Sequence, residues 1–175
     1  MKQNINIWEH AQEIMENVGK GALLTTRVGD EVNSMTIGWG MIGIEWKKPI
    51  FIAYVRQSRH TKKLLDANGE FTVNIPVGAC DKNILAVCGK ESGRDVNKIE
   101  KLGLTLIPGE TVSVPAIKEL PLTLECKVIY KQDQDPQAID EAATKRYYPA
   151  FFPDGRADYH TAYYAEIVSA YIIEE

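Results

Sequence analysis

The chain has 175 residues, of which 45% are hydrophobic and 25% charged, and its net charge is −4 at neutral pH. This length suits one domain with a sizeable core, so we expect a single domain over residues 1–175. The acidic balance argues against nucleic acid or an anionic membrane surface as the main partner. No apolar run reaches the length of a membrane span, and polar residues interrupt the N-terminal stretch where a signal peptide needs an apolar core. We therefore expect a cytoplasmic protein.

The cysteines and histidines form no metal or disulfide pattern. Cys80, Cys88 and Cys126 are odd in number and widely spaced, so they predict neither a disulfide framework nor a redox pair. The three histidines have no metal-ligand spacing with one another or with the cysteines. We expect buried structural thiols and no metal site.

Apolar periodicity and turn residues divide the first part of the chain into helices and strands. The expected elements are a helix over residues 7–18, strands over residues 23–28, 32–37 and 50–55, and a helix from an N-cap at Thr61 to a C-cap at Gly69. The first two strands are separated only by a short turn, so they are a hairpin candidate.

The second part of the chain continues with strands and short helices. The expected elements are a strand over residues 71–75, a helix over residues 82–88 capped by Asp81 and ended by Gly89, a short helix capped by Asp95, a strand over residues 120–130, a helix from Asp135 to about Arg146, an ordered loop over residues 147–159, and a strand over residues 162–173. Strands in succession with short helices between them indicate an antiparallel barrel with peripheral helices, mainly β with some α.

A glycine-rich segment at residues 38–43, GWGMIG, matches the dinucleotide-binding fingerprint letter for letter. That fingerprint needs its glycines to open a helix after a strand. Here Pro49 arrives six residues after the last glycine and a strand then begins, which leaves no room for a crossover helix. We therefore reject a Rossmann fold and expect a glycine-rich barrel corner, where the backbone can bend or approach a flat ligand closely.

Residues 55–62, VRQSRHTK, gather cations and hydroxyls between a buried strand and a helix start. Helix N-termini favour anions because their first N–H groups are unpaired and the helix dipole is positive there. The segment is therefore a candidate phosphate site, and a solvated basic turn is the alternative.

Two further features have both a structural and a functional interpretation. Ser92 and Gly93 lie in a polar turn before a helix, which is an ordinary cap or a place where a ligand can approach the backbone closely. His160 follows an aromatic loop, and a lone histidine is more often a hydrogen-bonded structural residue than a catalyst.

Taken together, several segments resemble the flavin reductase-like, FMN-binding split-barrel family, and within it the flavoredoxin type. The resemblance extends from about Gly21 to Ile173, and it is specific through the order and spacing of its parts. These parts are NSMTIGWG at residues 33–40, residues 49–56 with SRHT at 58–61, FTVNIP at 71–76, SGRDVNK at 92–98, LT at 104–105, LPLTLEC at 120–126 and HTAYYAEI at 160–167.

The resemblance implies a homodimer of six-stranded antiparallel Greek-key split barrels with tightly bound FMN at the subunit interface. The cofactor-binding residues that it implies are Asn33, Met35, Thr36, Ile37, Gly38 and Trp39 around the flavin ring, Arg56, Ser58, Arg59, Thr61 and Lys62 at the phosphate, Cys88, Gly89, Ser92 and Gly93 along the cofactor, and His160 near the ring or the substrate. It implies no catalytic acid or base, because the flavin itself carries the chemistry.

Three functions stay open at this point. The first is an FMN-dependent oxidoreductase that moves reducing equivalents from NAD(P)H to a flavin, iron or another acceptor. The second is an FMN electron carrier of flavoredoxin type that is served by a redox protein partner. The third is an FMN- or ligand-binding module without turnover. No separate nicotinamide-binding unit is predicted, so a hydride donor would have to stack directly over the flavin.

Overall fold

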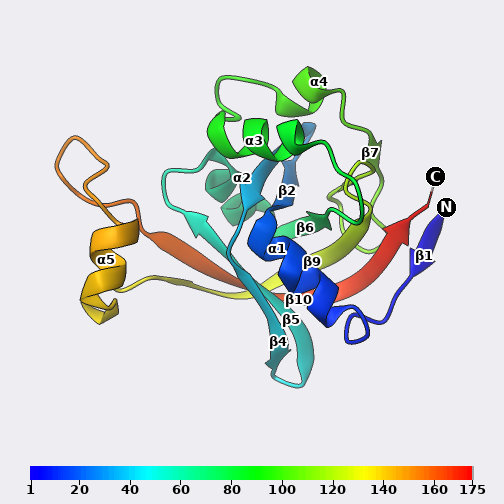
Figure 1. Ribbon diagram of the computed structural model, residues 1–175, viewed down its shortest axis with the longest axis horizontal. Helices are drawn as coiled ribbons and strands as arrows, with labels where there is room; N and C mark the ends of the chain where they lie inside the picture. The colour runs from blue at the N-terminus through cyan, green and yellow to red at the C-terminus, as the bar shows by residue number, and fades with distance from the viewer. Residues whose placement is uncertain (175) are drawn as a thin grey trace.

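Antiparallel strands dominate the computed structural model, which describes residues 1–174 (Figure 1). The main sheet has the strand order β3-β2-β6-β9-β10-β5-β4, and β1 adds to the far end of β10. Its strands are β1 (Lys2–Asn4), β2 (Ala22–Val28), β3 (Glu31–Ile37), β4 (Gly40–Glu45), β5 (Lys48–Arg56), β6 (Glu70–Ile75), β9 (Leu122–Asp133) and β10 (His160–Ile173). Two short strands, β7 (Leu106–Ile107) and β8 (Ala116–Ile117), pair separately.

The expected class, a mainly β antiparallel barrel with peripheral helices, is confirmed, but the expected count of six strands is wrong. The six strands expected from periodicity are β2, β3, β5, β6, β9 and β10, and the sheet of the described chain also contains β1 and β4. Strand β4 carries two glycines and β1 has only three residues, so neither shows a clear alternation of apolar and polar side chains.

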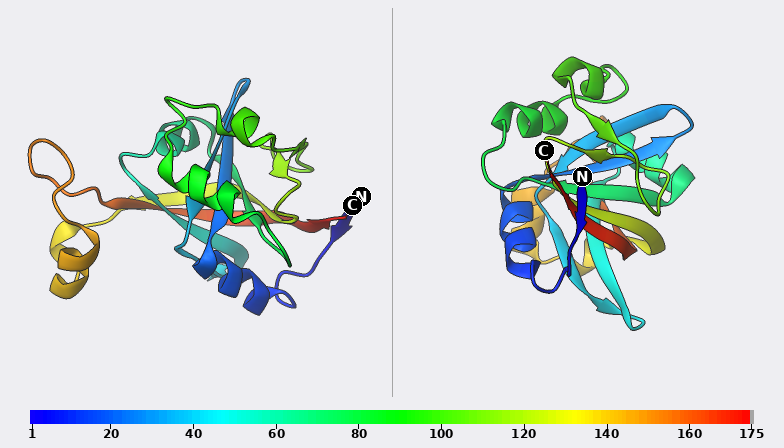
Figure 2. Two further views of the ribbon diagram at one scale, coloured as in Figure 1. Left: turned by 45° about the horizontal axis from the view of Figure 1, so that its top comes forward. Right: turned by 90° about the vertical axis from the view of Figure 1, so that its right-hand side faces the viewer.

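The helices lie at the periphery of the barrel (Figures 1 and 2). They are α1 (Ala11–Lys20), α2 (His60–Asn68), α3 (Lys82–Lys90), α4 (Lys98–Leu102), a 3₁₀ turn η1 (Pro136–Ala138) and α5 (Glu141–Tyr147). Among the described helices, none is both long enough and apolar enough to cross a membrane.

The core forms where strands are buried on both faces. In β2, β6 and β9 consecutive residues are buried, so apolar side chains such as Leu24, Val73 and Leu124 pack on one side. On the other side of the same strands, polar side chains pair with one another, and Thr25 contacts Ser34 with 2.7 Å between hydroxyl oxygens. Buried polar groups that satisfy one another in this way cost little stability.

The glycine-rich segment forms the start of the β4–β5 hairpin, which confirms that it is not a Rossmann fingerprint. Gly40 is required by packing, since a Cβ atom there would lie 2.6 Å from Cζ of Phe51. Trp46 and Lys47 form the two-residue turn, with φ values of 49° and 61°. Two positive φ angles in succession are typical of the type I′ turns that match the twist of paired strands.

Two helices differ at their ends from the expected boundaries. Thr61 is not an N-cap, because α2 begins one residue earlier with Arg59 in the capping position. Gly69 ends α2 as expected, in the left-handed conformation at φ 73°. Asp81 caps α3 as expected, but Gly89 lies inside this helix, which continues to Lys90. A glycine near the end of a helix is tolerated at modest cost.

Three other expected helices start later than their sequence signals. The first helix begins at Ala11 instead of residue 7. Asn97 caps α4 through a 3.3 Å bond from the N–H of Glu100, so the expected cap at Asp95 is wrong. Asp135 opens only a 3₁₀ turn, and Asp140 then caps α5 as a separate helix. For α4 and α5, a second Asn or Asp follows within a few residues and caps the helix.

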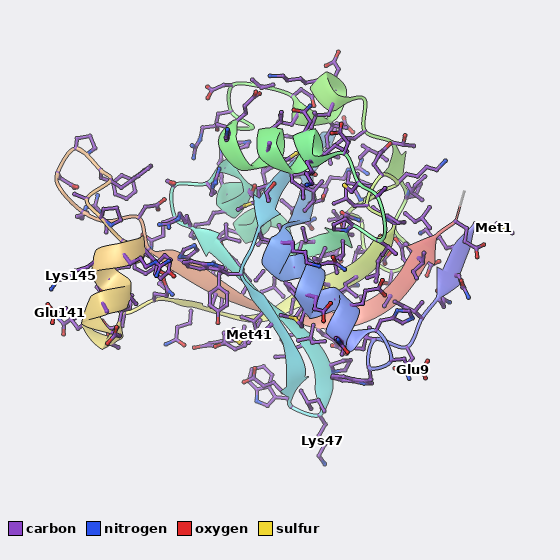
Figure 3. The ribbon with its side chains drawn as sticks, in the orientation of Figure 1. Met1, Glu9, Met41, Lys47, Glu141 and Lys145 are labelled. Carbon is purple, nitrogen blue, oxygen red and sulfur yellow. The ribbon has the colours of Figure 1, made fainter. Side chains whose placement is uncertain are left out.

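Strands β9 and β10 extend well past the barrel as a two-stranded ribbon that carries η1, α5 and the loop over residues 148–159 (Figures 1 and 2). We call residues 134–159 the arm. Glu141 and Lys145 lie on the outer side of α5, whereas Met41 and Lys47 mark the β4–β5 hairpin (Figure 3). The arm and the hairpin therefore both project from the barrel, and the candidate site lies where the arm meets it.

Candidate functional site

A cavity of about 1040 Å³ opens between the β5–α2 turn, the α3–α4 connection and the arm. This volume is at the upper end of what ligand pockets normally offer. The predicted residues that line it are Asn33, Met35, Arg56, Ser58, Arg59, Thr61, Gly89, Ser92 and Gly93. The structure therefore brings predicted residues from β3, from the β5–α2 turn and from the end of α3 with the turn after it around one cavity.

A smaller cavity of about 160 Å³ adjoins the first, since Met35, Arg56 and Arg59 line both. It adds the segment between β3 and β4 and the start of β10. The predicted residues that line this second cavity but not the larger one are Thr36, Ile37, Gly38, Trp39 and His160. The two cavities together form one site with a cationic part and an aromatic part.

Two predicted residues, Lys62 and Cys88, lie outside both cavities. Lys62 donates to Asp66 at 2.7 Å, one helical turn along α2, and therefore turns away from the site. Cys88 is fully buried among apolar side chains such as Leu23 and Ile84, on the inner face of α3. Burial raises the pKa of the Cys88 thiol, which suits a structural role.

Arg59 presents a free cation to both cavities. Its guanidinium makes no hydrogen bond or ion pair with any side chain or carbonyl of residues 1–174, although the residue is half-buried. Burial lowers its pKa, Arg56 lowers it further, and Asp158 opposes both. A half-buried guanidinium without a protein partner is placed to bind an anionic ligand.

Asn33, Thr61 and Gly93 form a closely packed polar corner of the larger cavity. Nδ2 of Asn33 donates to Oγ1 of Thr61 at 2.8 Å, which leaves the Thr61 hydroxyl proton free to donate to a ligand. A Cβ atom at Gly93 would lie only 2.2 Å from Oδ1 of Asn33. Glycine is therefore needed at this position, and the backbone of the 92–93 turn lies directly against the site.

Both hydrogen-bond donors of Ser58 are already bonded to another part of the chain. Asp158 of the arm, which is 2% exposed, accepts from the Ser58 N–H at 2.9 Å and from its hydroxyl at 2.6 Å. Arg56 holds the same segment, donating to the carbonyls of Asp158 at 2.6 Å and of Tyr147 at 3.1 Å. Ser58 and Arg56 thus fix the arm to the β5–α2 turn, while Arg59 and Thr61 keep unused donors.

Several cavity residues were missed by the sequence prediction. Lys98 is only 3% exposed, its Nζ lies 3.3 Å from the carbonyl oxygen of Glu91, and burial lowers its pKa. Arg94 reaches back to the carbonyl of Ser58 with both terminal nitrogens at 3.1 Å. The segment SGRDVNK at residues 92–98 held the signal, since it brings two cations just after a glycine turn.

The arm contributes six more missed residues, which are Arg146, Tyr147, Pro149, Phe151, Phe152 and Asp158. Their contribution follows from the length of the β9–β10 ribbon, which local periodicity does not fix. Across the whole larger cavity the cations outnumber the carboxylates. The charged lining residues are Arg56, Arg59, Lys90, Arg94, Lys98 and Arg146 against Glu91 and Asp158.

Two histidines differ sharply in their surroundings. Nε2 of His60 lies 2.6 Å from a carboxylate oxygen of Glu31, and its Nδ1 is buried without a hydrogen-bond partner among residues 1–174. The ring of His160 lies 4.9 Å from that of Trp39 and has a pKa lowered to about 4 by burial and by the charge of Arg56. His160 is therefore neutral near pH 7.

The family model described as flavin reductase like domain matches residues 17–175. The chain belongs to this family. Among solved structures, this flavin reductase-like chain is similar to the flavoredoxin of Desulfovibrio vulgaris (Miyazaki F), with 25% identity and a TM-score of 0.66 over 88% of this chain and 69% of that one. A flavoredoxin from Methanosarcina acetivorans is similar at 27% identity and a TM-score of 0.65, over 88% and 68% of the two chains.

An FMN-binding domain of a flavin reductase-like enzyme from Shewanella baltica shares the fold, with a TM-score of 0.69 at 17% identity over 98% of this chain and 77% of that one. Among curated relatives, the chain is 35% identical over 100 residues to an uncharacterised protein of Archaeoglobus fulgidus, a match that covers 57% of this chain and 55% of the relative. The match to protein YddH of Escherichia coli is 29% identical over 123 residues and covers 69% and 64%. The flavin reductase-like chain thus spans less than two thirds of these curated relatives.

Proposed function

We propose that this protein is an FMN-binding flavoprotein oxidoreductase, and that its β5–α2 turn holds the phosphate end of FMN. One observation carries the proposal. In a chain of the flavin reductase-like family, a half-buried Arg59 without a protein partner lines both a large cationic cavity and a smaller aromatic one. A flavin mononucleotide has the matching polarity, with a phosphate at one end and a flat heterocycle at the other.

The residues present fit a bound phosphate. Arg59 offers an unpaired guanidinium and Thr61 an unused hydroxyl proton. Both residues lie at the start of α2, a nine-residue helix whose first N–H groups favour an anion. Gly93 lets the backbone of the 92–93 turn lie close to the same space, which any Cβ atom would narrow.

The second cavity fits a flat ring. Met35 and Trp39 border it, and Gly38 and Trp39 lie between β3 and β4, outside the strand ladder, where the backbone is open to a ligand. His160 lines the same cavity beside Trp39, with the two rings 4.9 Å apart between centroids and tilted by 40°. The protein thus supplies position, electrostatics and exclusion of water, while a bound flavin supplies hydride or single-electron transfer.

Two kinds of activity fit this site, and the comparisons favour neither. Solved structures of similar fold include flavoredoxins and, at 15% identity, a Streptomyces globisporus NADH:FAD oxidoreductase. We therefore propose two candidate activities, one that uses NAD(P)H directly and one that exchanges electrons with a protein partner. Anaerobic addition of NADH or NADPH separates them, because only the first bleaches the bound flavin without a partner.

We also propose that the protein is a homodimer through the outer face of the β4–β5 hairpin. A row of apolar side chains crosses four strands there, since Met41 pairs with Ile52, Ile52 with Tyr164, and Tyr164 with Tyr130. The exposed members of this face are Met41 at 51%, Trp46 at 62% and Tyr130 at 42%, and the rings of Trp46 and Tyr130 lie 6.5 Å apart. A contiguous apolar face of this kind favours a protein partner.

A second copy of the chain is the occupant that we propose, because the face continues into the site. Met41 and Trp39 line one further cavity, and Trp39 also lines the proposed ring cavity. A dimer would therefore bury the open side of the ring site. Light scattering should give twice the mass of the chain, and Trp46→Lys should give the monomer mass. A monomeric wild-type protein at working concentration would contradict the dimer.

The test of the cofactor is reconstitution with FMN followed by desalting and a visible absorption spectrum. We expect a yellow protein with flavin bands. Arg59→Ala should weaken FMN affinity about tenfold or more, because a charged hydrogen bond contributes roughly 1.5–3 kcal/mol. Lys63→Ala is the matched control, since it removes an exposed cation from the same helix. A protein that stays colourless would overturn the flavin assignment, and equal affinity of the two variants would overturn the phosphate site.

A further inference from the structure

A chain of hydrogen bonds behind the ring cavity fixes the orientation of one amide. Oε1 of Gln134 accepts from the backbone N–H of His160 at 3.0 Å, and the backbone N–H of Gln134 donates to the carbonyl of His160 at 3.0 Å. A backbone N–H can only donate, so the atom of Gln134 that faces it must be the oxygen. The amide orientation of Gln134 therefore follows from the backbone of β10.

Tyr148 of the arm continues this chain. Its hydroxyl lies 2.8 Å from Oε1 of Gln134 and 3.0 Å from Nδ1 of His160. The Gln134 oxygen has no proton, so the single phenol proton of Tyr148 must be donated to it. The Tyr148 oxygen can then only accept from His160, and Nδ1 of His160 must carry a proton.

The other nitrogen of the His160 ring faces the site. Nε2 makes no hydrogen bond with residues 1–174 and is not among their fully buried unpaired atoms. The ring lines the smaller cavity together with Trp39 and Arg59, and Trp39 packs against it at 4.9 Å between centroids. Burial and the charges of Arg56 and Arg59 lower the pKa of His160, whereas Asp158 raises it, and the ring is neutral with its proton on Nδ1.

We infer that Gln134 and Tyr148 are positioning residues that hold His160 in the Nδ1–H tautomer, so that Nε2 is an open hydrogen-bond acceptor for an N–H group of the bound ligand. The ligand class is a heterocycle that carries a ring N–H, and its identification as a flavin rests on the proposed function. In this arrangement the arm influences ligand binding indirectly, because its residues Gln134 and Tyr148 set the tautomer of His160. His160 accepts a hydrogen bond there and transfers no proton.

Nitrogen NMR of the histidine rings in the FMN-free, ¹⁵N-labelled protein tests the positioning role directly. The wild-type protein should show a protonated Nδ1 and an unprotonated Nε2 for His160 at pH 7, with the assignment made by loss of the signals in His160→Gln. Tyr148→Phe and Gln134→Leu should give a mixture of tautomers. Gln134→Glu keeps the acceptor oxygens and should restore the single tautomer.

Tyr159→Phe is the matched control, because Tyr159 stacks on Tyr148 at 4.9 Å but its hydroxyl takes no part in the chain. It should leave the His160 signals unchanged. A protonated Nε2 in the wild-type protein would overturn the inference, and so would an unaltered single tautomer in both Tyr148→Phe and Gln134→Leu.

Addition of FMN to the same sample tests the acceptor role. The Nε2 signal should move on binding, as expected for a nitrogen that accepts a hydrogen bond, and the Nδ1 proton should stay in place. Binding of FMN with an unmoved Nε2 signal would overturn the acceptor role. Failure to bind FMN would overturn the proposed function and the flavin as donor, while the FMN-free spectra would still decide the positioning role.

Discussion

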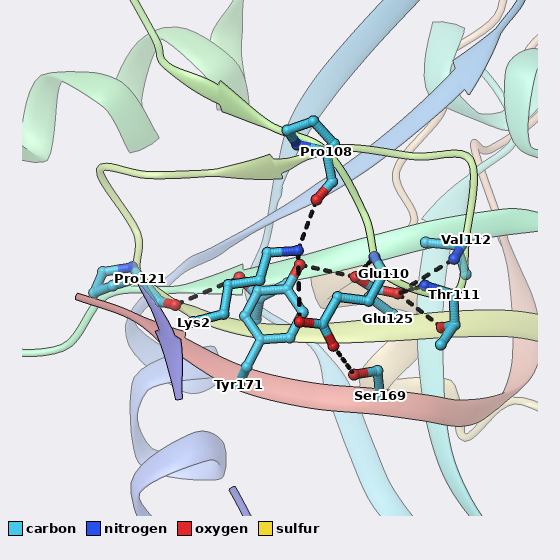
Figure 4. A network of polar contacts seen from close by, with 10 residues as sticks. Lys2, Pro108, Glu110, Thr111, Val112, Pro121, Glu125, Ser169 and Tyr171 are labelled. Carbon is cyan, nitrogen blue, oxygen red and sulfur yellow. Dashed lines mark hydrogen bonds and ion pairs between the residues drawn. The ribbon is translucent and has the colours of Figure 1, made fainter. Parts of the chain in front are cut away.

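Two regions of the molecule gather hydrogen-bond donors around one point, and only one of them has room for a ligand. In the first, the buried carboxylate of Glu125 on β9 accepts from the N–H groups of Glu110, Thr111 and Val112 at 2.7 to 3.2 Å (Figure 4). The hydroxyls of Thr111 and Tyr171 add bonds of 2.7 and 2.8 Å. The chain thus supplies its own anion to this set of donors.

The second region is the β5–α2 turn, where the chain fills only part of the donor set. Asp158 takes the N–H and hydroxyl of Ser58, but Arg59 has no partner among residues 1–174 and Thr61 keeps a free proton. The comparison shows that convergent donors alone do not identify a ligand site. Donors that the chain leaves unpaired next to a cavity are what make the β5–α2 turn the candidate site.

We expect the largest effect from a substitution in the first region, the Glu125 cluster, which we call the filled region because the chain itself supplies the anion. Glu125→Gln places an amide among five donors and removes the charge that they share, so it should lower the free energy of unfolding by roughly 3 kcal/mol or more. Chemical denaturation at pH 7 measures the loss. Glu110→Gln is the control, because its side chain is partly exposed and should change stability by less than about 0.5 kcal/mol. Equal stability of the two variants would show that the Glu125 cluster is not a structural anchor.

The next effect concerns pH, and it separates the ligand site from the filled region. The pKa of His160 is lowered to about 4, below its value of about 6.5 in an unfolded chain. The unfolded state therefore binds the proton first, and this group destabilises the fold as the pH falls from about 6.5 to about 4. Between pH 7 and pH 4.5 the loss should be roughly 2 kcal/mol.

His160→Gln should remove most of that pH dependence, and denaturation curves at the two pH values measure it. Glu125 acts in a lower range, because its hydrogen bonds outweigh burial and hold its pKa below the usual value. Its contribution is present above about pH 4 and is lost at lower pH. If the stability of His160→Gln falls between pH 7 and pH 4.5 as much as that of the wild-type protein, the assignment to His160 is wrong.

More of the candidate ligand region than of the Glu125 cluster could be predicted from the sequence. Local signals placed Arg59 and Thr61 after a buried strand and before a helix, and the mainly β class followed from the alternation in β9 and β10. The backbone N–H partners of Glu125 come from a loop with no periodic pattern, so their convergence depends on tertiary packing. The contact of Asp158 with Ser58 could not be predicted for the same reason, because it depends on the path of the arm.

A smaller effect tests whether Asp158 competes with a bound phosphate. Asp158→Asn keeps an acceptor for Ser58 but removes a negative charge beside the proposed phosphate position. FMN affinity should rise about fivefold, or roughly 1 kcal/mol, because the anion meets less repulsion. Titration calorimetry with FMN measures the change. Asp154→Asn, on the exposed part of the same arm, should leave the affinity unaltered. Weaker binding in Asp158→Asn would mean that the carboxylate serves the site by holding the arm.

The smallest effect isolates a single unused donor. Thr61→Val removes the hydroxyl but keeps the shape of the side chain, so FMN affinity should fall about fivefold, as expected for one hydrogen bond of about 1 kcal/mol. The variant also leaves Nδ2 of Asn33 without its 2.8 Å partner, which costs some stability even without FMN. Thr61→Ser restores the hydroxyl and should recover both properties. If Thr61→Val loses stability while FMN affinity is unchanged, the Thr61 hydroxyl is a structural partner of Asn33, and Arg59 is then the open donor that distinguishes this region from the Glu125 cluster.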